Sequence, residues 1–155
     1  MPQMNKGGKF VFGLSLIQGG GTVQLPAQAI AEYSIAAEGR VYLFTGSKVT
    51  GGFCVTRKGL LAPSMLGHIL TENPALQEYH TPEGEFVRYK GRFYCWLRIS
   101  AGGALHFRPD ALAFLGLAPG MRLLSIRSSD IAFTMGAKGP LLERAARYPG
   151  RLPLF

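Results

Sequence analysis

Charged residues are few in this sequence, and acidic residues are the scarcest of them. Charged side chains make up 17% of the 155 residues and hydrophobic ones 47%, which excludes the composition of a disordered chain and suits one well-buried core. Nine Asp and Glu stand against seventeen Lys and Arg, giving a net charge of +8. This excess favours a polyanion such as nucleic acid, or an anionic membrane face, as partner. Residues 10–39 hold no Lys or Arg at all.

Cysteine is nearly absent, and so are long apolar runs. Cys54 and Cys95 lie in apolar surroundings without CxxC spacing, which excludes a zinc motif or a disulfide framework and predicts buried free thiols. No apolar run has the length needed to span a bilayer, and residues 1–8 lack the apolar stretch of a signal peptide. We therefore expect a cytoplasmic protein with no membrane partner.

Motifs of catalysis are also missing. His68, His80 and His106 are far apart, with no HExxH spacing, and the sequence contains no nucleophile elbow. Carboxylates are scattered over turns and a helix start, where Asp110 suits the first turn of a helix. The sequence predicts a protein that is not an enzyme and that has no cofactor and no metal.

What the sequence does contain is an internal repeat of about fifty residues. Gly8-Lys9-Phe10 aligns with Gly91-Arg92-Phe93, and the register continues through a glycine cluster, a proline and a second glycine to Lys58-Gly59 and Lys138-Gly139. Two copies are too few for a stacked solenoid, so they predict one pseudo-symmetric core. The chain is then a single domain over residues 1–155. Its parts are repeat 1 (about 6–61), a helical connector (62–87), repeat 2 (about 88–142), and a C-terminal helix and tail (143–155).

Each copy has the same pattern of elements. Apolar residues alternate at period two before the glycine cluster, which predicts a strand and a tight turn. A short strand, a proline-initiated helix, a third strand, a polar loop and a last strand (FCVTRKG or IAFTMGAKG) follow. The fold class is therefore mainly β with short helices (α+β), with two internal repeats sharing one pseudo-symmetric core.

The phrases GTVQLPAQAIAEYSIAAEG and GALHFRPDALAFLGLAPGM resemble the AbrB/MazE/SpoVT family, and their occurrence in tandem is similar to the MraZ-type arrangement. The resemblance covers about two thirds of the chain. It implies a pseudo-two-fold swapped-hairpin barrel and a role in transcriptional regulation through DNA binding. The sequence departs from the family where a basic residue would follow the turn, since Thr22 and Ala104 stand there, and neither predicted helix holds Lys or Arg.

Double-stranded DNA is the predicted partner, and a row of basic residues supplies the candidate contacts. The predicted DNA-binding residues are Lys9, Arg88, Lys90, Arg92, Arg98 and Arg108. Arg92 and Arg98 share a strand face because their spacing is even, and we interpret Arg88 and Lys90 as an extension of that row. Such a row could follow a phosphate backbone. A solvated sheet face explains the same residues equally well.

Two alternatives remain open. The loops TGSKVTGG and RSSD could offer backbone N–H groups to a phosphate or nucleotide, with Ser47, Lys48, Arg127 and Ser128 as candidate anion-binding residues, although plain hairpin turns also explain them. The chain could equally be a protein-interaction module without DNA binding. Tyr94 and Trp96 are expected on the face opposite the core, where an apolar patch predicts a homodimer.

Overall fold

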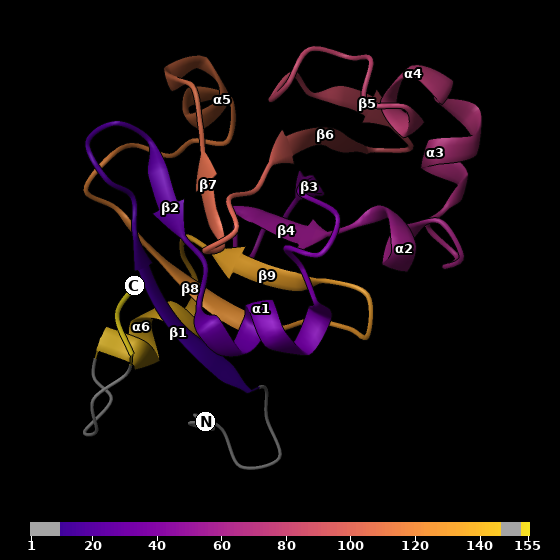
Figure 1. The fold of residues 1–155 in the computed structure, drawn as a ribbon. Helices are drawn as coiled ribbons and strands as arrows, with labels where there is room; N and C mark the ends of the chain where they lie inside the picture. Colours follow the sequence, from indigo (N-terminus) through magenta and orange to yellow (C-terminus); the bar gives the residue numbers. More distant parts are fainter. Residues whose placement is uncertain (1–9, 147–152) are drawn as a thin grey trace.

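The computed structural model of the protein describes residues 10–146 and 153–155. Its strands form a seven-stranded antiparallel sheet and a separate two-stranded sheet, surrounded by short helices (Figure 1). The predicted mainly β fold with short helices is therefore confirmed. The first half of the chain contains β1 (Val11–Leu16), β2 (Thr22–Gln24), α1 (Ala27–Tyr33), β3 (Arg40–Thr45) and β4 (Phe53–Thr56).

The second half has the same order of elements. It contains β6 (Arg92–Arg98), β7 (Ala104–His106), α5 (Pro109–Phe114), β8 (Arg122–Arg127) and β9 (Phe133–Gly136), followed by α6 (Pro140–Ala146). Repeat 1 ends with α2 (Lys58–Leu61). The connector supplies α3 (His68–Glu72), α4 (Pro74–Gln77) and the start of β5 (Val87–Tyr89). The expected boundary between connector and repeat 2 thus falls inside β5.

Both copies of the last strand are shorter than predicted, since β9 covers only Phe133–Gly136 of the segment IAFTMGAKG. FCVTRKG was expected to be a strand throughout, but β4 ends at Thr56 and the chain turns into α2. A single carboxylate explains the turn. Glu38 accepts a hydrogen bond from the backbone N–H of Gly59 at 2.9 Å and pairs with the guanidinium of Arg57 at 2.8 Å. These two contacts hold the start of α2 against the turn before β3.

Four strand pairs join one half of the chain to the other, while β3–β4 and β8–β9 pair within a half. β1 pairs with β8, β3 with β6, β4 with β9 and β2 with β7, all antiparallel. The main sheet runs in the order β1-β8-β9-β4-β3-β6-β5. Among the described strands this sheet is open, with β1 and β5 at its ends, and the closed barrel of the sequence prediction is not seen there.

The sheet edge at β1 is covered by the end of the chain. The backbone N–H groups of Leu14 and Leu16 donate to the carbonyl oxygens of Pro153 and Phe155 at 2.8 and 2.9 Å. The ring of Phe155 lies against Gly13, where a Cβ atom would come within 2.8 Å of it. A side chain at position 13 would therefore displace this segment.

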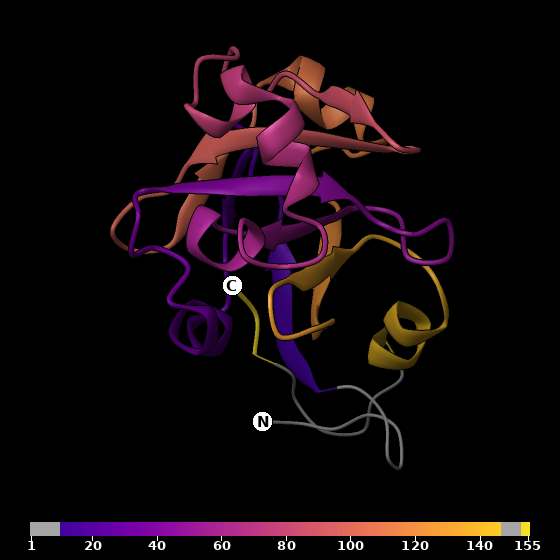
Figure 2. The same ribbon diagram turned by 90° about the vertical axis from the view of Figure 1, so that its right-hand side faces the viewer.

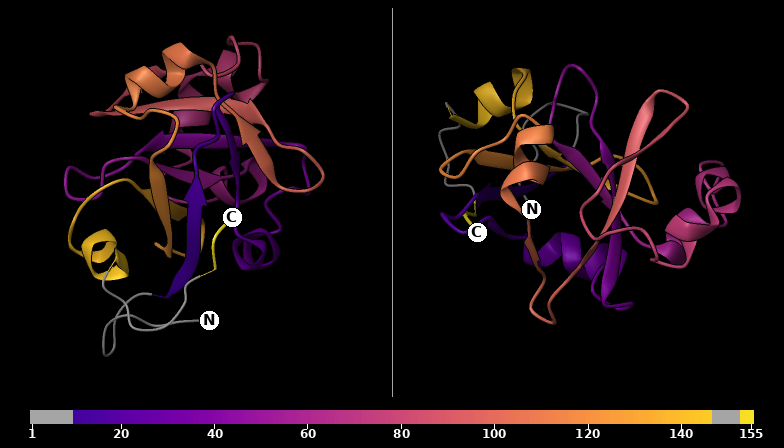
Figure 3. Two further views of the ribbon diagram at one scale, coloured as in Figure 1. Left: turned by 90° about the vertical axis from the view of Figure 1, so that its left-hand side faces the viewer. Right: turned by 90° about the horizontal axis from the view of Figure 1, so that it is seen from above.

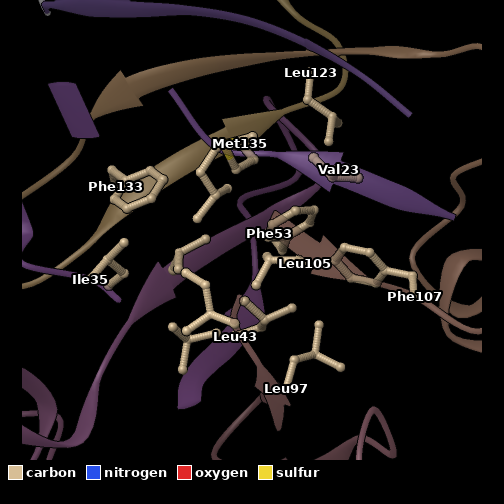
Figure 4. Close-up of a cluster of buried hydrophobic side chains, with 14 of the residues drawn as sticks. Val23, Ile35, Leu43, Phe53, Leu97, Leu105, Phe107, Leu123, Phe133 and Met135 are labelled. Atoms are coloured by element: carbon tan, nitrogen blue, oxygen red, sulfur yellow. The ribbon is translucent and has the colours of Figure 1, made fainter. Parts of the chain in front are cut away.

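One face of the main sheet and the β2–β7 pair enclose the largest apolar cluster. The residues at its centre come from both halves, as Figure 4 shows for side chains that point toward one another. Examples from the two halves are Val23 and Phe53, which lie with Leu105 and Phe133, all with no exposed surface. The halves therefore share a core.

The connector covers the opposite face of the sheet on the side of β3 and β6 (Figure 2). Tyr94 and Trp96, predicted to form an exposed dimer patch, are only 3% and 6% exposed. The indole N–H of Trp96 donates to the carbonyl oxygen of Thr81 at 2.7 Å, and Leu70 and Leu76 pack in the same cluster. The patch that predicted a homodimer is therefore covered by the chain itself, because the connector supplies the apolar partner.

Helix α6 covers the same face of the sheet at its other end, over β8. Leu141 and Leu142 pack on Leu124 and Ile126, and Figure 3 (right) shows α6 and the connector helices on opposite sides of the molecule. Each cover is short and comes from a different part of the chain. The central pair β4–β9 lies between these two covers in the strand order.

Candidate nucleic-acid interface and neighbouring cavity

Three predicted DNA-binding residues meet at one end of the β5–β6 hairpin. Arg88, Lys90 and Arg92 are all exposed, and β5 is an edge strand of the main sheet. The strands are joined by a tight turn in which Lys90 has a φ angle of 45° and Gly91 has a φ angle of 80°. The three cations therefore gather around a tight turn at the edge of the molecule.

The register shows that these cations do not form a single row. Arg88 is opposite Phe93 and Tyr89 is opposite Arg92 in the ladder. Because neighbouring strand residues point to opposite faces, Arg88 lies on the other face of the hairpin from Arg92. The cations thus surround the hairpin end on both faces.

The remaining predicted contacts lie elsewhere. Arg98 shares the face of Arg92 but stands at the far end of β6, with the buried Tyr94 and Trp96 between them. Arg108 precedes α5 and pairs with Asp110 at 3.3 Å. Lys9 lies outside the described residues. The structure therefore brings together three of the six candidates.

Sequence reasoning missed one cation beside Arg98. Arg40 lies directly opposite Arg98 in the β3–β6 ladder, and its guanidinium lies over the ring of Tyr79 at 4.7 Å. Like charges at this spacing repel each other, and the carboxylate of Glu83 lies beside them, where it accepts a hydrogen bond from the backbone N–H of Arg98 at 2.8 Å. Arg40 and Arg98 are neighbours only because two strands far apart in sequence pair with each other, so no local sequence pattern could predict their proximity.

Acidic partners neutralise few of these cations. Three ion pairs occur among residues 10–146 and 153–155: Arg57–Glu38, Arg108–Asp110 and Arg127–Glu32. Arg88, Lys90 and Arg92 take part in none of them. The carboxylate of Glu72 lies near the hairpin, but it accepts a hydrogen bond from the hydroxyl of Tyr89. The hairpin end keeps its positive charge.

Both predicted anion-binding loops reach one cavity of about 390 Å³. Ser47 of the first loop and Ser128 of the second line it, together with Arg92. The other two candidates do not line it. Lys48 is exposed, and Arg127 pairs with Glu32 and lies over the ring of Phe10 at 4.5 Å. The sequence predicted the loops as separate features, and in the structure one serine of each loop lines the same cavity.

The first loop is held by glycines and hydroxyls. A Cβ atom at Gly52, whose φ is +63°, would come within 1.9 Å of the carbonyl oxygen of Met135. The hydroxyl of Ser47 accepts a hydrogen bond from the backbone N–H of Thr50 at 3.2 Å. The second loop is fixed from α1, because the hydroxyl of Tyr33 donates to the carbonyl oxygen of Ser129 at 2.7 Å. Both loops are thus anchored to the strands they join.

Cys54 and Thr134 also line the cavity and face each other across the β4–β9 pair. The Cys54 sulfur and the Thr134 hydroxyl oxygen are 3.4 Å apart. Burial raises the pKa of the Cys54 thiol, an effect partly offset by the Thr134 hydrogen bond and the charge of Arg92. The group is therefore a protonated thiol at neutral pH. Cys54 and Cys95 are both buried and free, as the sequence predicted.

Within residues 10–146 and 153–155, no group of three or more His, Cys, Asp or Glu side chains is placed to hold a metal ion. No helix in this part of the chain has the length and apolar character to cross a membrane. The histidine His106 lies in β7, with its Nδ1 3.5 Å from the hydroxyl of Thr22.

No protein-family model matches this sequence, and no curated protein matches it either. The function therefore has to be inferred from the residues and their geometry.

Proposed function

We propose that the protein binds double-stranded DNA through the end of the β5–β6 hairpin and acts as a transcriptional regulator of the AbrB-like, swapped-hairpin kind. The observation that carries the proposal is the group of three exposed cations, Arg88, Lys90 and Arg92, which have no carboxylate partner among the described residues.

The strand pairing supports the family part of this proposal. Each half contributes two strands, a helix and two more strands, and β1 and β6 each pair with the third strand of the other half. Halves that exchange their strands in this way are expected of two swapped hairpins carried on one chain. This pairing pattern supports the resemblance that the sequence phrases carry.

The hairpin has the shape and charge for a duplex. The major groove of B-DNA is about 12 Å wide and admits a two-stranded β-ribbon. Cations on both faces of the ribbon would reach the phosphates on either side of the groove, giving affinity with little sequence readout. The described helices α1 and α5 contain no Lys or Arg, so the contact surface differs from the one that the family resemblance implies.

The test is charge reversal with a matched control. The double variant Arg88→Glu and Lys90→Glu is compared with Arg122→Glu and Arg144→Glu, exposed positions on β8 and α6 at the other end of the sheet. Each exchange lowers the charge by two, so both double variants go from +8 to +4. Binding to a labelled duplex is followed by fluorescence anisotropy over a range of salt concentrations.

We expect the hairpin variant to lose most DNA affinity and its salt dependence to fall by about two phosphate contacts, at roughly 0.9 in the logarithmic slope per contact. The control variant should stay close to the natural protein. Equal losses of DNA affinity in the two variants would show that the effect depends on net charge alone and not on this surface. Unchanged binding in the hairpin variant would exclude this surface.

A further inference from the structure

The cavity lies where the two halves of the chain meet. Cys54 is the second residue of β4 and Thr134 the second of β9, and these two positions face each other in the ladder. Phe44 and Ile126 are likewise the fifth residues of β3 and β8, and both line the cavity. The two halves thus contribute corresponding residues to one site.

The lining is cationic and rich in hydroxyl groups. Among residues 10–146 and 153–155, Arg92 is the only charged residue that lines the cavity, and the hydroxyls of Ser47, Thr50 and Ser128 lie with it. Asp130 belongs to the second loop, but it is exposed and does not line the cavity. A hydroxyl can donate to a phosphate oxygen, and a guanidinium binds one through charge-assisted hydrogen bonds. The polar part of this lining suits an anion.

Arg92 is positioned by an aromatic ring. Its guanidinium lies 5.3 Å from the centre of the Phe44 ring, and no ion pair among the described residues includes it. Contact with a ring face orients a guanidinium but leaves its charge unneutralised. A cation held in this way at the wall of a cavity remains available to an anionic ligand.

The rest of the wall is apolar. Phe44, Leu66, Ile126 and Ile131 line the cavity, and Leu66 comes from the connector. The volume of about 390 Å³ lies within the range of roughly 300 to 1,000 Å³ that is usual for small-molecule sites. A bare inorganic anion would leave this apolar surface uncovered. The cavity therefore suits an anion with an apolar or aromatic body.

We propose that this cavity binds a small phosphorylated compound, whose phosphate contacts Arg92 and the loop hydroxyls and whose ring or apolar body lies against Phe44 and Ile126. The site requires both halves of the chain and the connector. It makes the protein a receptor for a small ligand, and this role does not depend on whether the β5–β6 hairpin binds DNA.

Isothermal titration calorimetry on the full chain tests the site, with AMP, adenosine and inorganic phosphate as probes. We expect AMP to bind more tightly than either adenosine or phosphate, because only AMP offers both parts of the ligand. The change Arg92→Gln should weaken AMP binding by roughly ten- to a hundredfold, as expected for loss of hydrogen bonds to a charged group. Adenosine binding should not change.

Arg98→Gln is the matched control, because it makes the same exchange on the same strand at an exposed position that does not line the cavity. It should leave the affinity for AMP within about twofold of the natural value. Ser128→Ala gives a second variant in case Arg92→Gln fails to fold. The Ser128 side chain makes no hydrogen bond within the described residues. Loss of its hydroxyl should lower the affinity for AMP roughly two- to tenfold.

Three results would overturn the proposal. They are no AMP binding to the natural protein, equal affinities for AMP and adenosine, and equal weakening by Arg92→Gln and Arg98→Gln. The DNA test uses Arg88 and Lys90, which do not line the cavity. Loss of one activity with retention of the other therefore identifies which of the two sites has failed.

Discussion

The three consecutive glycines at positions 19–21 have different roles. Gly21 has a φ of +89°, and a Cβ atom there would come within 2.2 Å of the carbonyl oxygen of Phe107. The corresponding position in the second half is Gly103, with a φ of +87° and the Ile30 side chain 2.1 Å from a built Cβ atom. Each glycine cluster thus contains one position with a positive φ angle and a close neighbour, the backbone of Phe107 for Gly21 and the side chain of Ile30 on α1 for Gly103.

We expect Gly21→Ala to lower the free energy of unfolding by about 2 kcal/mol or more, because it combines a strained φ angle with a backbone clash. Urea unfolding followed by circular dichroism measures the change. Gly20→Ala is the control, since a Cβ atom at Gly20 meets nothing within 4 Å. The interpretation fails if the two variants are equally stable.

Tyr33 makes the free energy of unfolding depend on pH in the alkaline range. Burial of its hydroxyl, together with the charge of Glu32, raises the pKa of Tyr33 from 10.0 to about 12. Between these values the unfolded chain loses the proton while the folded chain keeps it. The stabilisation is therefore complete below pH 10 and falls as the pH rises toward 12, by roughly 2 to 3 kcal/mol for this residue.

Urea unfolding of the natural protein and Tyr33→Phe at about pH 8, 10 and 11 tests this. The variant should start less stable by about 1 kcal/mol, because the hydrogen bond to Ser129 is lost. It should then lose less stability with pH than the natural protein. Parallel decline in the two proteins would show that Tyr33 does not contribute to the alkaline effect.

Among the elements, the end of the chain protects a sheet edge. Deletion of residues 153–155 removes the hydrogen-bond acceptors of Leu14 and Leu16 and uncovers β1. We expect the free energy of unfolding to fall by about 1 to 3 kcal/mol, and the protein to self-associate through the exposed edge. Urea unfolding and light scattering measure the two effects.

Phe155→Ala separates the ring from the backbone pairing. It removes the contact with Gly13 but keeps the acceptors, so it should lower stability without causing association. Association of Phe155→Ala to the same extent as the deletion would mean that the ring, and not the backbone, protects the edge.

The elements of the two copies could be predicted from the sequence, but their surroundings could not. Alternating apolar residues and the proline-led helix start correctly indicated β6 and α5. The same alternation assigned Tyr94 and Trp96 to an exposed face, because a period of two does not tell whether the second face is covered. Their cover comes from the connector, whose residues are near in space but carry no pattern that names their partner strand.

At the scale of the whole molecule, the shared core predicts unfolding as one unit. The core cluster draws on both halves, and four of the strand pairings join one half to the other. Trp96, the single tryptophan, reports the contact between β6 and the connector. Its emission and the circular dichroism signal should therefore change at the same urea concentration. Separate midpoints would contradict this, because they would mean that the contact between β6 and the connector opens apart from the rest of the fold.

The candidate sites show the same limit of sequence reasoning. Arg88, Lys90 and Arg92 are close in sequence, so their proximity in space could be predicted. Ser47 and Ser128 come together only because β4 pairs with β9, a contact between segments about eighty residues apart. Arg92 was assigned to a row of DNA contacts, and its place at the cavity wall depends on the pairing of β6 with β3.

The pairing of strands between the halves also makes domain swapping between two molecules possible in concentrated samples. Two molecules that trade their second halves would keep every pairing of the main sheet, with each partner completing the other. The four strand pairings between the halves and the shared core would have to open first, together with the packing of the connector and the Trp96 hydrogen bond to Thr81. The rate at which a purified monomer converts to a domain-swapped dimer is therefore limited by the same barrier as its unfolding.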